Sequence, residues 1–215
     1  MKDKDIHIVV KELREIVPNW KPPVVGAMTT DPYKVLISTI LSLRTKDAMT
    51  EKSSNTLFAI ADTPQKMIQL DTDVIEKAIY PVGFYRRKAI NIHEISKILL
   101  DKYDGKVPND IDELLTLKGV GRKTANLTVT LGYNSLGICV DIHVHRITNR
   151  WGYVKTKNPD ETEFVLRDKL PKEYWIEINH LLVSYGQNLC TPVSPKCSIC
   201  PIFKYCDRVG VTSSR

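Results

Sequence analysis

Four cysteines near the end of the chain have the residue type and the spacing of metal ligands. They follow the pattern Cys-x6-Cys-x2-Cys-x5-Cys and are Cys190, Cys197, Cys200 and Cys206. Thiolates gathered this closely bind soft metals, so zinc and an iron–sulfur cluster are the two candidates. Structural zinc usually takes two short Cys-x2–4-Cys pairs, and only Cys197 and Cys200 form one. The spacing therefore predicts a metal centre, and a loop this short is able to wrap a compact cluster, but the choice of metal stays open.

A glycine hairpin with a lysine beside it is the second candidate for chemistry. The segment Leu117-Lys-Gly-Val-Gly-Arg-Lys-Thr-Ala125 follows a short predicted helix and leads into a longer one that begins at Arg122. Two glycines allow a tight turn and a close approach by a nucleic acid backbone. The unpaired amides of the next helix's first turn are able to donate to phosphate oxygens. The pattern predicts a phosphate contact made by Gly119, Val120, Gly121 and Arg122.

Lys123 lies in the first turn of that longer helix and has three possible roles. It is a solvated surface lysine, a phosphate contact or a nucleophilic amine. A helix N-terminus disfavours an added positive charge and so favours the uncharged form that attacks carbon. Burial would act in the same direction. Spacing alone does not separate the three roles.

Asp141 opens the segment Asp141-Ile-His-Val-His-Arg146 and is well placed to cap a helix over 142–151. A carboxylate at a helix end is also able to accept a proton from a lysine nucleophile and to stabilise a cationic sugar. A nearby carboxylate would at the same time favour the charged amine, which opposes the helix effect. His143 and His145 are two residues apart, so they point to different faces of the helix and are not expected to bind one metal ion together. Of the two, only His143 is a candidate for a DNA contact.

Composition narrows the class of protein. The chain has 215 residues, enough for one large or two small domains, and Lys+Arg exceed Asp+Glu by 31 to 25. This modest basic excess favours a polyanionic partner without requiring one. Cys139 lies in an apolar stretch and is expected to be buried, and an odd cysteine count argues against a disulfide scaffold. With a charged N-terminus and no long apolar run, we expect a soluble intracellular protein.

Helical periodicity runs through nearly the whole chain and predicts an all-α fold of roughly ten short helices. Asp31-Pro32 is a strong helix start. A late apolar stripe is formed by Trp175, Ile178, Leu182, Tyr185 and Leu189. An earlier stripe is formed by Ala89, Ile92, Ile95 and Leu99, and the residues expected to face away from it are Lys88, Asn91, Glu94 and Lys97. No breaker is long enough to separate independent domains, so two lobes would pack closely.

These motifs together resemble the endonuclease III family of DNA glycosylases, within the helix-hairpin-helix superfamily. The likeness extends over about residues 30 to 206. The matching segments are the hairpin at 117–126, the aspartate segment at 140–144, the four-cysteine loop and two further DNA-facing segments at 40–47 and 83–89. The resemblance implies two helical lobes with a DNA-binding cleft between them. A central domain at 24–134 would carry the hairpin at about 110–132, and a discontinuous domain at 1–23 plus 135–215 would carry the cysteine loop at 190–206.

The resemblance also implies roles for the candidate residues. Lys123 would be the nucleophile and Asp141 its partner, and the four cysteines would hold a [4Fe-4S] cluster. The implied activity removes oxidised pyrimidines from duplex DNA and then cleaves the strand at the abasic site through a lysine Schiff base. Further DNA contacts would come from Arg44, Phe84, His143, Lys196 and Lys204. The expected enzyme is a monomer of the cytoplasm, associated with the nucleoid.

Three positions depart from the family pattern. Lys118 stands in place of the usual hairpin proline, Arg44 in place of a glutamine that fills the gap left by a flipped base, and Phe84 in place of a leucine wedge. A phenylalanine at a helix start is also often a core residue. The alternatives are a mismatch thymine or uracil glycosylase, whose relatives often lack the lysine, and a non-catalytic hairpin module with a structural zinc.

Overall fold

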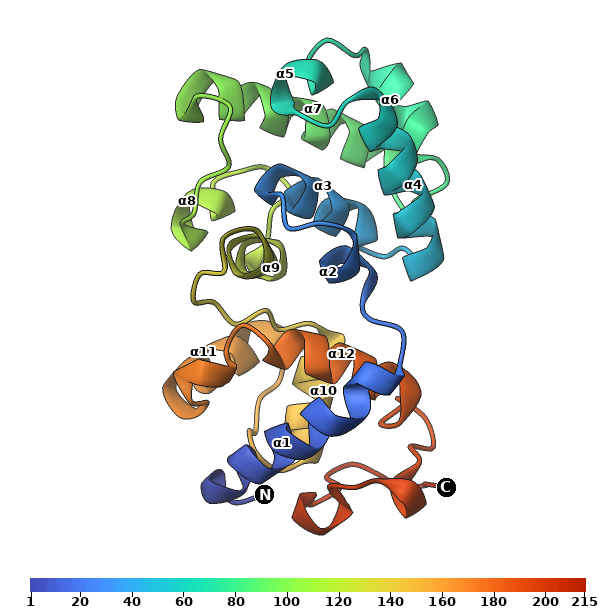
Figure 1. The fold of residues 1–215 in the computed structure, drawn as a ribbon, viewed down its shortest axis with the longest axis vertical. Coiled ribbons are helices and arrows are strands. Elements are labelled where there is room, and N and C mark those ends of the chain that lie inside the picture. The colour runs from blue at the N-terminus through green and yellow to red at the C-terminus, as the bar shows by residue number, and fades with distance from the viewer. The chain divides into compact units, whose positions relative to one another are not determined.

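The computed structural model describes all 215 residues, and its regular elements are helices only, as predicted (Figure 1). The chain forms two compact units, Val24–Gly137 and Met1–Pro23 together with Ile138–Arg215. Each unit has its own cluster of buried apolar side chains. The domain division expected from the sequence places the second boundary after residue 134 and stays a prediction.

The unit at 24–137 is built from eight α-helices. They are α2 (Val24–Met28), α3 (Pro32–Ser42), α4 (Asp47–Ile60), α5 (Pro64–Met67), α6 (Thr72–Ile79), α7 (Tyr85–Tyr103), α8 (Ile111–Leu115) and α9 (Arg122–Tyr133). The predicted start of α3 is confirmed, since the Asp31 carboxylate accepts a hydrogen bond of 2.9 Å from the amide of Lys34. Helices α3 and α9 pack closely because Gly132 lacks a side chain, and a Cβ there would lie 2.9 Å from the Cα of Pro32.

The outer face predicted for α7 is wrong at two positions. Lys88 is only 6% exposed and Asn91 only 7%, although the helical stripe predicts that both face away from the core. The hairpin turn lies against one of them, because a Cβ on Gly119 would meet the side chain of Asn91 at 2.5 Å. The ammonium of Lys88 donates to carbonyls at the C-terminal end of α3. Helix α7 is therefore covered on more faces than its apolar stripe indicates.

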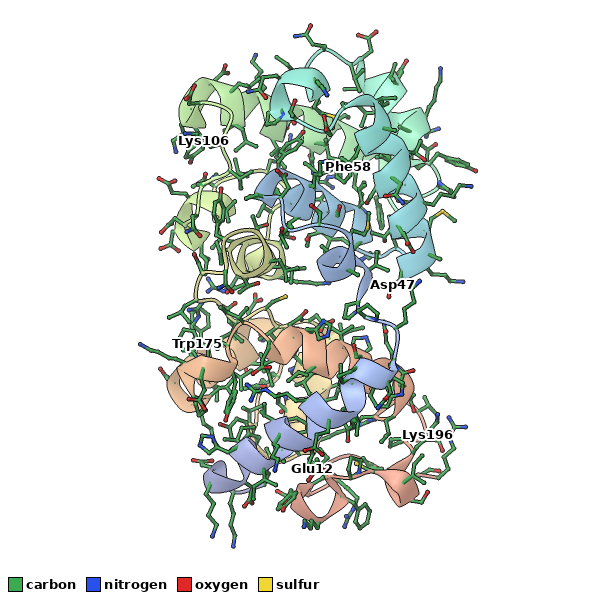
Figure 2. The ribbon with its side chains drawn as sticks, in the orientation of Figure 1. Glu12, Asp47, Phe58, Lys106, Trp175 and Lys196 are labelled. Atoms are coloured by element: carbon green, nitrogen blue, oxygen red, sulfur yellow. The ribbon has the colours of Figure 1, made fainter.

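The second unit is built from α1 (Ile6–Ile16), α10 (Ile142–Arg150), α11 (Pro159–Lys169), α12 (Ile178–Asn188) and the loop that carries the four cysteines. Every member of the late apolar stripe is buried, as predicted. Cys139 is 1% exposed, which confirms its expected place in the core. Figure 2 shows the side chains on both units and marks Lys196 on the cysteine loop.

The helix count is slightly higher than predicted. The chain has twelve α-helices and five short 3-10 turns, against an expected ten or so. The difference comes from single-turn segments such as α2, which follows Pro23, and α5, which begins at Pro64. Such segments are too short to show a period. No helix has the length and apolar character needed to cross a membrane.

Candidate active site and iron–sulfur centre

The hairpin forms between α8 and α9 as predicted. Gly119 has a φ of +85°, in the region that favours glycine, and the amide of Val120 closes the turn on the carbonyl of Leu117 at 3.0 Å. A Cβ on Gly121 would have no heavy atom within 4 Å, so this position faces open space. The Lys118 ammonium lies 3.2 Å from the Glu94 carboxylate of α7, and the turn survives the loss of the usual proline.

Lys123 is the second residue of α9 and is half-buried. The N-cap residue of α9 is Gly121, which has no side chain, so no capping side chain satisfies the first amides of the helix. Further along α9, Thr124 and Thr128 are buried, and the Thr128 hydroxyl donates to the carbonyl of Thr124 at 2.8 Å. Lys123 therefore lies at the start of α9, directly after the glycine turn.

Asp141 caps α10, which confirms its local role. Its Oδ1 accepts hydrogen bonds from the amides of His143, at 2.9 Å, and Val144, at 3.0 Å. Its Oδ2 takes part in neither cap bond, and the side chain is half-buried. One carboxylate oxygen thus fixes the side chain to the helix while the other is left out of the cap, an arrangement that suits a carboxylate with a second task.

His143 lies within the unit of α10 and α12. Its Nδ1 is 3.1 Å from Nη2 of Arg146, and a Cβ on Gly186 would lie 2.4 Å from the same ring nitrogen. The imidazole is therefore packed against α12. A DNA contact by this histidine remains a proposal.

Arg44 and Phe84 lie side by side on the unit at 24–137. Both have positive φ, 54° and 58°, which is uncommon for residues with a side chain. The Arg44 guanidinium carbon is 5.5 Å from the centre of the Phe84 ring. Phe84 is 61% exposed, so it is not the core residue that a helix-start phenylalanine often is.

The four cysteines line one largely apolar cavity in the second unit. No group of three or more His, Cys, Asp or Glu side chains is placed to hold a single metal ion. The four thiols thus share a space without converging on one point, and a cluster that offers each thiol its own iron fits this better than zinc. Burial raises the pKa of Cys206 to about 11 and also raises the pKa of Cys200. Positively charged metal in the cavity would be needed for these thiols to lose their protons and become thiolate ligands.

Two side chains contact the cysteine loop in ways that the sequence did not indicate. Tyr185 of α12 places its hydroxyl 2.9 Å from Sγ of Cys200. Arg150 of α10 donates to Sγ of Cys190 at 3.5 Å and to the carbonyl of Thr191 at 2.6 Å. Arg146, one turn earlier on the same face of α10, donates to the carbonyl of Cys190 at 3.0 Å. The i, i+4 spacing of the two arginines is the only sequence signal for these contacts, and it is weak.

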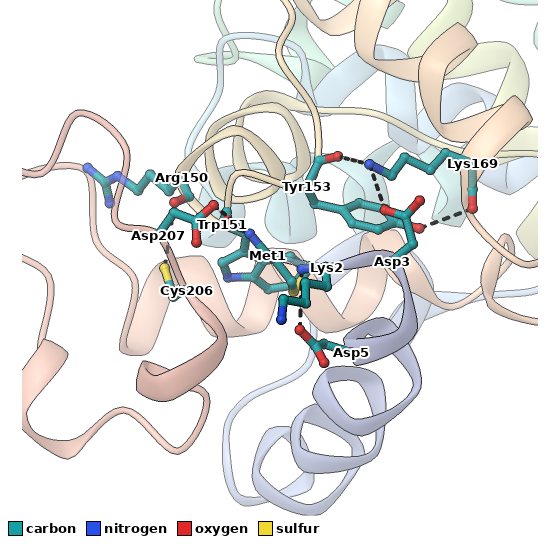
Figure 3. A network of polar contacts seen from close by, with 10 residues as sticks. All are labelled: Met1, Lys2, Asp3, Asp5, Arg150, Trp151, Tyr153, Lys169, Cys206 and Asp207. Atoms are coloured by element: carbon teal, nitrogen blue, oxygen red, sulfur yellow. Dashed lines mark hydrogen bonds and ion pairs between the residues drawn. The ribbon is translucent and has the colours of Figure 1, made fainter.

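A network of polar contacts joins the start of the chain to the far end of the cysteine loop (Figure 3). The ammonium of Met1 donates to the carbonyl of Trp151 at 2.8 Å and to the carboxylate of Asp207 at 2.5 Å. The neighbouring Cys206 Sγ lies 3.6 Å from the carbonyl of Arg150. The residue that follows the last cysteine is thereby tied to the helical body of the unit.

Replacing Arg150 with alanine should weaken retention of the metal centre. Groups that orient metal ligands typically contribute about 10–100-fold to metal affinity, and Arg150 holds both the first cysteine and the two residues after it. We expect the visible absorption of the Arg150→Ala protein to decay about tenfold faster in chelator. Arg14→Ala is the control, since Arg14 pairs with Glu177 in the same unit. Equal decay rates for both variants and the wild type would contradict the role of Arg150.

Comparisons with known proteins agree with this geometry. Residues 37–172 match the model of the HhH-GPD superfamily of base excision DNA repair proteins, and residues 190–206 match the iron–sulfur binding domain of endonuclease III. The second match confirms the predicted iron–sulfur cofactor. The assignment of the individual cysteines as its ligands rests on the shared cavity.

Individual relatives extend over nearly the whole chain. The chain is 47% identical to endonuclease III of Thermotoga maritima, over 93% of this chain and 92% of that one. It is 44% identical to a chloroplastic endonuclease III homolog of Arabidopsis thaliana over 81% of this chain, but it spans only 48% of that longer protein.

A solved structure has the same fold. It is a trapped covalent intermediate of endonuclease III with DNA, 33% identical in sequence, with a TM-score of 0.87 over 97% of both chains. The chain therefore belongs to the endonuclease III family, within the HhH-GPD superfamily of base excision DNA repair proteins.

Proposed function

We propose that the chain removes oxidised pyrimidines from duplex DNA and then cleaves the strand at the resulting abasic sugar. The observation that carries this proposal is the placement of Lys123 in the first turn of α9, directly beside the open glycine position of the hairpin. A backbone phosphate held by the hairpin amides would bring a deoxyribose near the amine. The enzyme is accordingly a DNA glycosylase and abasic-site lyase of base excision repair, with duplex DNA as its partner.

The reaction begins with extrusion of the damaged base, because the sugar carbon is not accessible while the base is stacked. The Lys123 amine attacks C1′ of the sugar, and the base leaves with the electrons of the glycosidic bond. The C1′–O4′ bond then breaks, O4′ takes up a proton as the sugar ring opens, and a protonated Schiff base remains between C1′ and the lysine nitrogen. Loss of a proton from C2′ then expels the 3′ phosphate by β-elimination. Hydrolysis of the remaining imine frees the lysine.

Asp141 supports the first step. A lysine attacks only when it has lost its proton, and the positive charge that develops on the sugar needs a nearby anion. The cap bonds hold Oδ1, so Oδ2 is the oxygen proposed to accept the proton and face the sugar cation. The cap fixes the carboxylate without help from DNA, which keeps the cost of ordering it low.

Binding of the duplex is proposed to use groups that carry no sequence information. The hairpin amides, Arg122, Lys196 and Lys204 contact phosphates, and His143 adds a further contact. Phe84 enters the base stack as a wedge and Arg44 fills the space left by the extruded base. Such contacts suit a monomer that works along chromosomal DNA in the nucleoid.

Cys190, Cys197, Cys200 and Cys206 would hold the [4Fe-4S] cluster in the cavity that they line. When bound, the cluster supplies four iron–thiolate bonds that close the loop, and bond cleavage in DNA is left to Lys123 and Asp141. The loop then presents Lys204, which is exposed, in a fixed position.

A panel of duplexes tests the proposed substrate class. We expect excision and strand cleavage on an oxidised pyrimidine paired with adenine, strand cleavage on an abasic site, and at least about a hundredfold slower excision of uracil or thymine from mismatches with guanine. Such a difference is expected where polar pocket groups recognise the damaged base. Faster excision from the mismatches would identify a mismatch glycosylase instead. Binding to all duplexes without cleavage would identify a non-catalytic module.

A further inference from the structure

Lys88 is a buried lysine that the proposed chemistry does not use. It lies in the first turn of α7 and its side chain is 6% exposed. Its ammonium donates to the carbonyl of Leu41 at 2.8 Å, the carbonyl of Leu43 at 2.7 Å and the hydroxyl of Thr45 at 3.3 Å. All three acceptors are uncharged, and all belong to the C-terminal end of α3 and the turn that follows it. Lys88 thus supplies donors to carbonyls that a helix end leaves unpaired.

Thr45 extends this contact to the other side of the turn. Its hydroxyl oxygen accepts a hydrogen bond of 3.1 Å from the amide of Gly83, the residue before Phe84. The same hydroxyl donates to the carbonyl of Leu43 at 3.3 Å. The ammonium of Lys88 and the hydroxyl of Thr45 therefore join the turn after α3 to the turn before α7.

The two joined turns carry Arg44 and Phe84 in left-handed backbone conformations. They touch through the backbone, since a Cβ on Gly83 would lie 2.5 Å from the carbonyl oxygen of Arg44. Non-glycine residues with positive φ persist only where their surroundings hold them, and such residues gather at functional sites. The contacts of Lys88 are surroundings of this kind.

Burying a charged side chain costs desolvation free energy, so the hydrogen bonds of Lys88 must offset that cost. An apolar side chain of the same length would leave the carbonyls of Leu41 and Leu43 without a donor. Burial lowers the pKa of Lys88 to about 8, so the ammonium is still mainly charged at neutral pH and offers all three donors. The negative end of the α3 dipole also stabilises this positive charge.

We propose that Lys88 is a positioning residue that sets Arg44 and Phe84 side by side for insertion into the opened duplex. The inference rests on the proposed function, because it assigns the two exposed side chains to base extrusion. Because Lys88 is only 6% exposed, it is assigned no contact with DNA or with the reacting sugar. Its loss should impair the opening of a paired lesion and spare the bond cleavage that follows.

The test compares one lesion in two settings. The substrates are an oxidised pyrimidine paired with adenine in a duplex, and the same lesion inside a three-base bubble that is already open. Lys88→Met keeps the length of the side chain and removes the donors. It should slow single-turnover excision from the paired duplex by about tenfold and from the bubble by less than about twofold. Lys97→Met, an exposed lysine of the same helix, is the control and should match the wild type on both.

A milder variant keeps the test open if Lys88→Met does not fold. Thr45→Val removes only the hydroxyl that links Gly83 to Lys88, and its control is Thr39→Val, whose hydroxyl bonds within α3 to Val35. Thr45→Val should show the same selective loss on the paired duplex, by about threefold to fivefold.

Equal slowing on both substrates, or no slowing on either, would overturn the role of Lys88 in positioning, because a merely structural residue does not distinguish a paired from an open lesion. A wild-type enzyme that is inactive on both substrates would overturn the proposed function instead. The two failures are therefore distinct.

Discussion

Lys123→Ala is expected to lose excision and strand cleavage together, by at least about a thousandfold, while its affinity for DNA stays within a few-fold of the wild type. The amine forms the only covalent bond between enzyme and sugar in the proposed reaction, so no other group is able to start either step. The hairpin amides that hold the phosphate belong to the backbone and survive the change. Single-turnover assays on an oxidised-pyrimidine duplex and filter binding on the same duplex give the two quantities.

Lys118→Ala is the matched control for this variant. Lys118 lies in the same hairpin, is well exposed, and pairs with Glu94 at 3.2 Å. We expect its loss to leave turnover within about threefold of the wild type, since an exposed ion pair contributes little. If Lys118→Ala were as inactive as Lys123→Ala, the hairpin as a whole and not one amine would carry the activity.

Asp141→Asn is expected to lower turnover by at least about a hundredfold with a shift in melting temperature of no more than a few degrees. Asparagine is as good a cap as aspartate, so its Oδ1 is able to keep the hydrogen bonds from the amides of His143 and Val144. It has no negative charge and does not accept a proton at neutral pH, so the assistance to the amine is lost. Turnover and thermal unfolding are measured on the same preparation.

The control is a cap of the same kind elsewhere in the fold. Asp31 caps α3 through a bond of 2.9 Å from the amide of Lys34, so Asp31→Asn makes the same chemical change at a helix start. It should keep nearly full activity. If Asp141→Asn were destabilised and inactive to the same extent, the carboxylate would be only a cap.

The features that the sequence predicted correctly depend on local signals. Asp31 and Asp141 each begin a helix because a short acceptor side chain reaches the amides two or three residues on, a rule that needs no tertiary structure. The glycines of the hairpin are likewise required by the turn itself, as the φ of Gly119 demonstrates. The cysteine spacing predicted a metal centre because a short loop forces its members together, and the comparison with known iron–sulfur domains then decided the cofactor.

The features that the sequence predicted wrongly or missed depend on distant contacts. Lys88 was expected on the outer face of α7, because its helix shows a single apolar stripe and lysine is seldom buried. The acceptors that bury it lie more than 40 residues away along the chain, at Leu41 and Leu43. The contacts of Tyr185 and Arg150 with the cysteine loop were missed for the same reason, since each side chain reaches the loop from a separate helix. No periodicity records such partners.

Reduction of the enzyme–DNA intermediate with borohydride, followed by peptide mapping, tests the central claim most directly. The wild-type enzyme should yield one covalent adduct on an oxidised-pyrimidine duplex, with the deoxyribose on Nζ of Lys123, and Lys123→Ala should yield none. An adduct on any other amine, or one that persists in Lys123→Ala, would contradict the account.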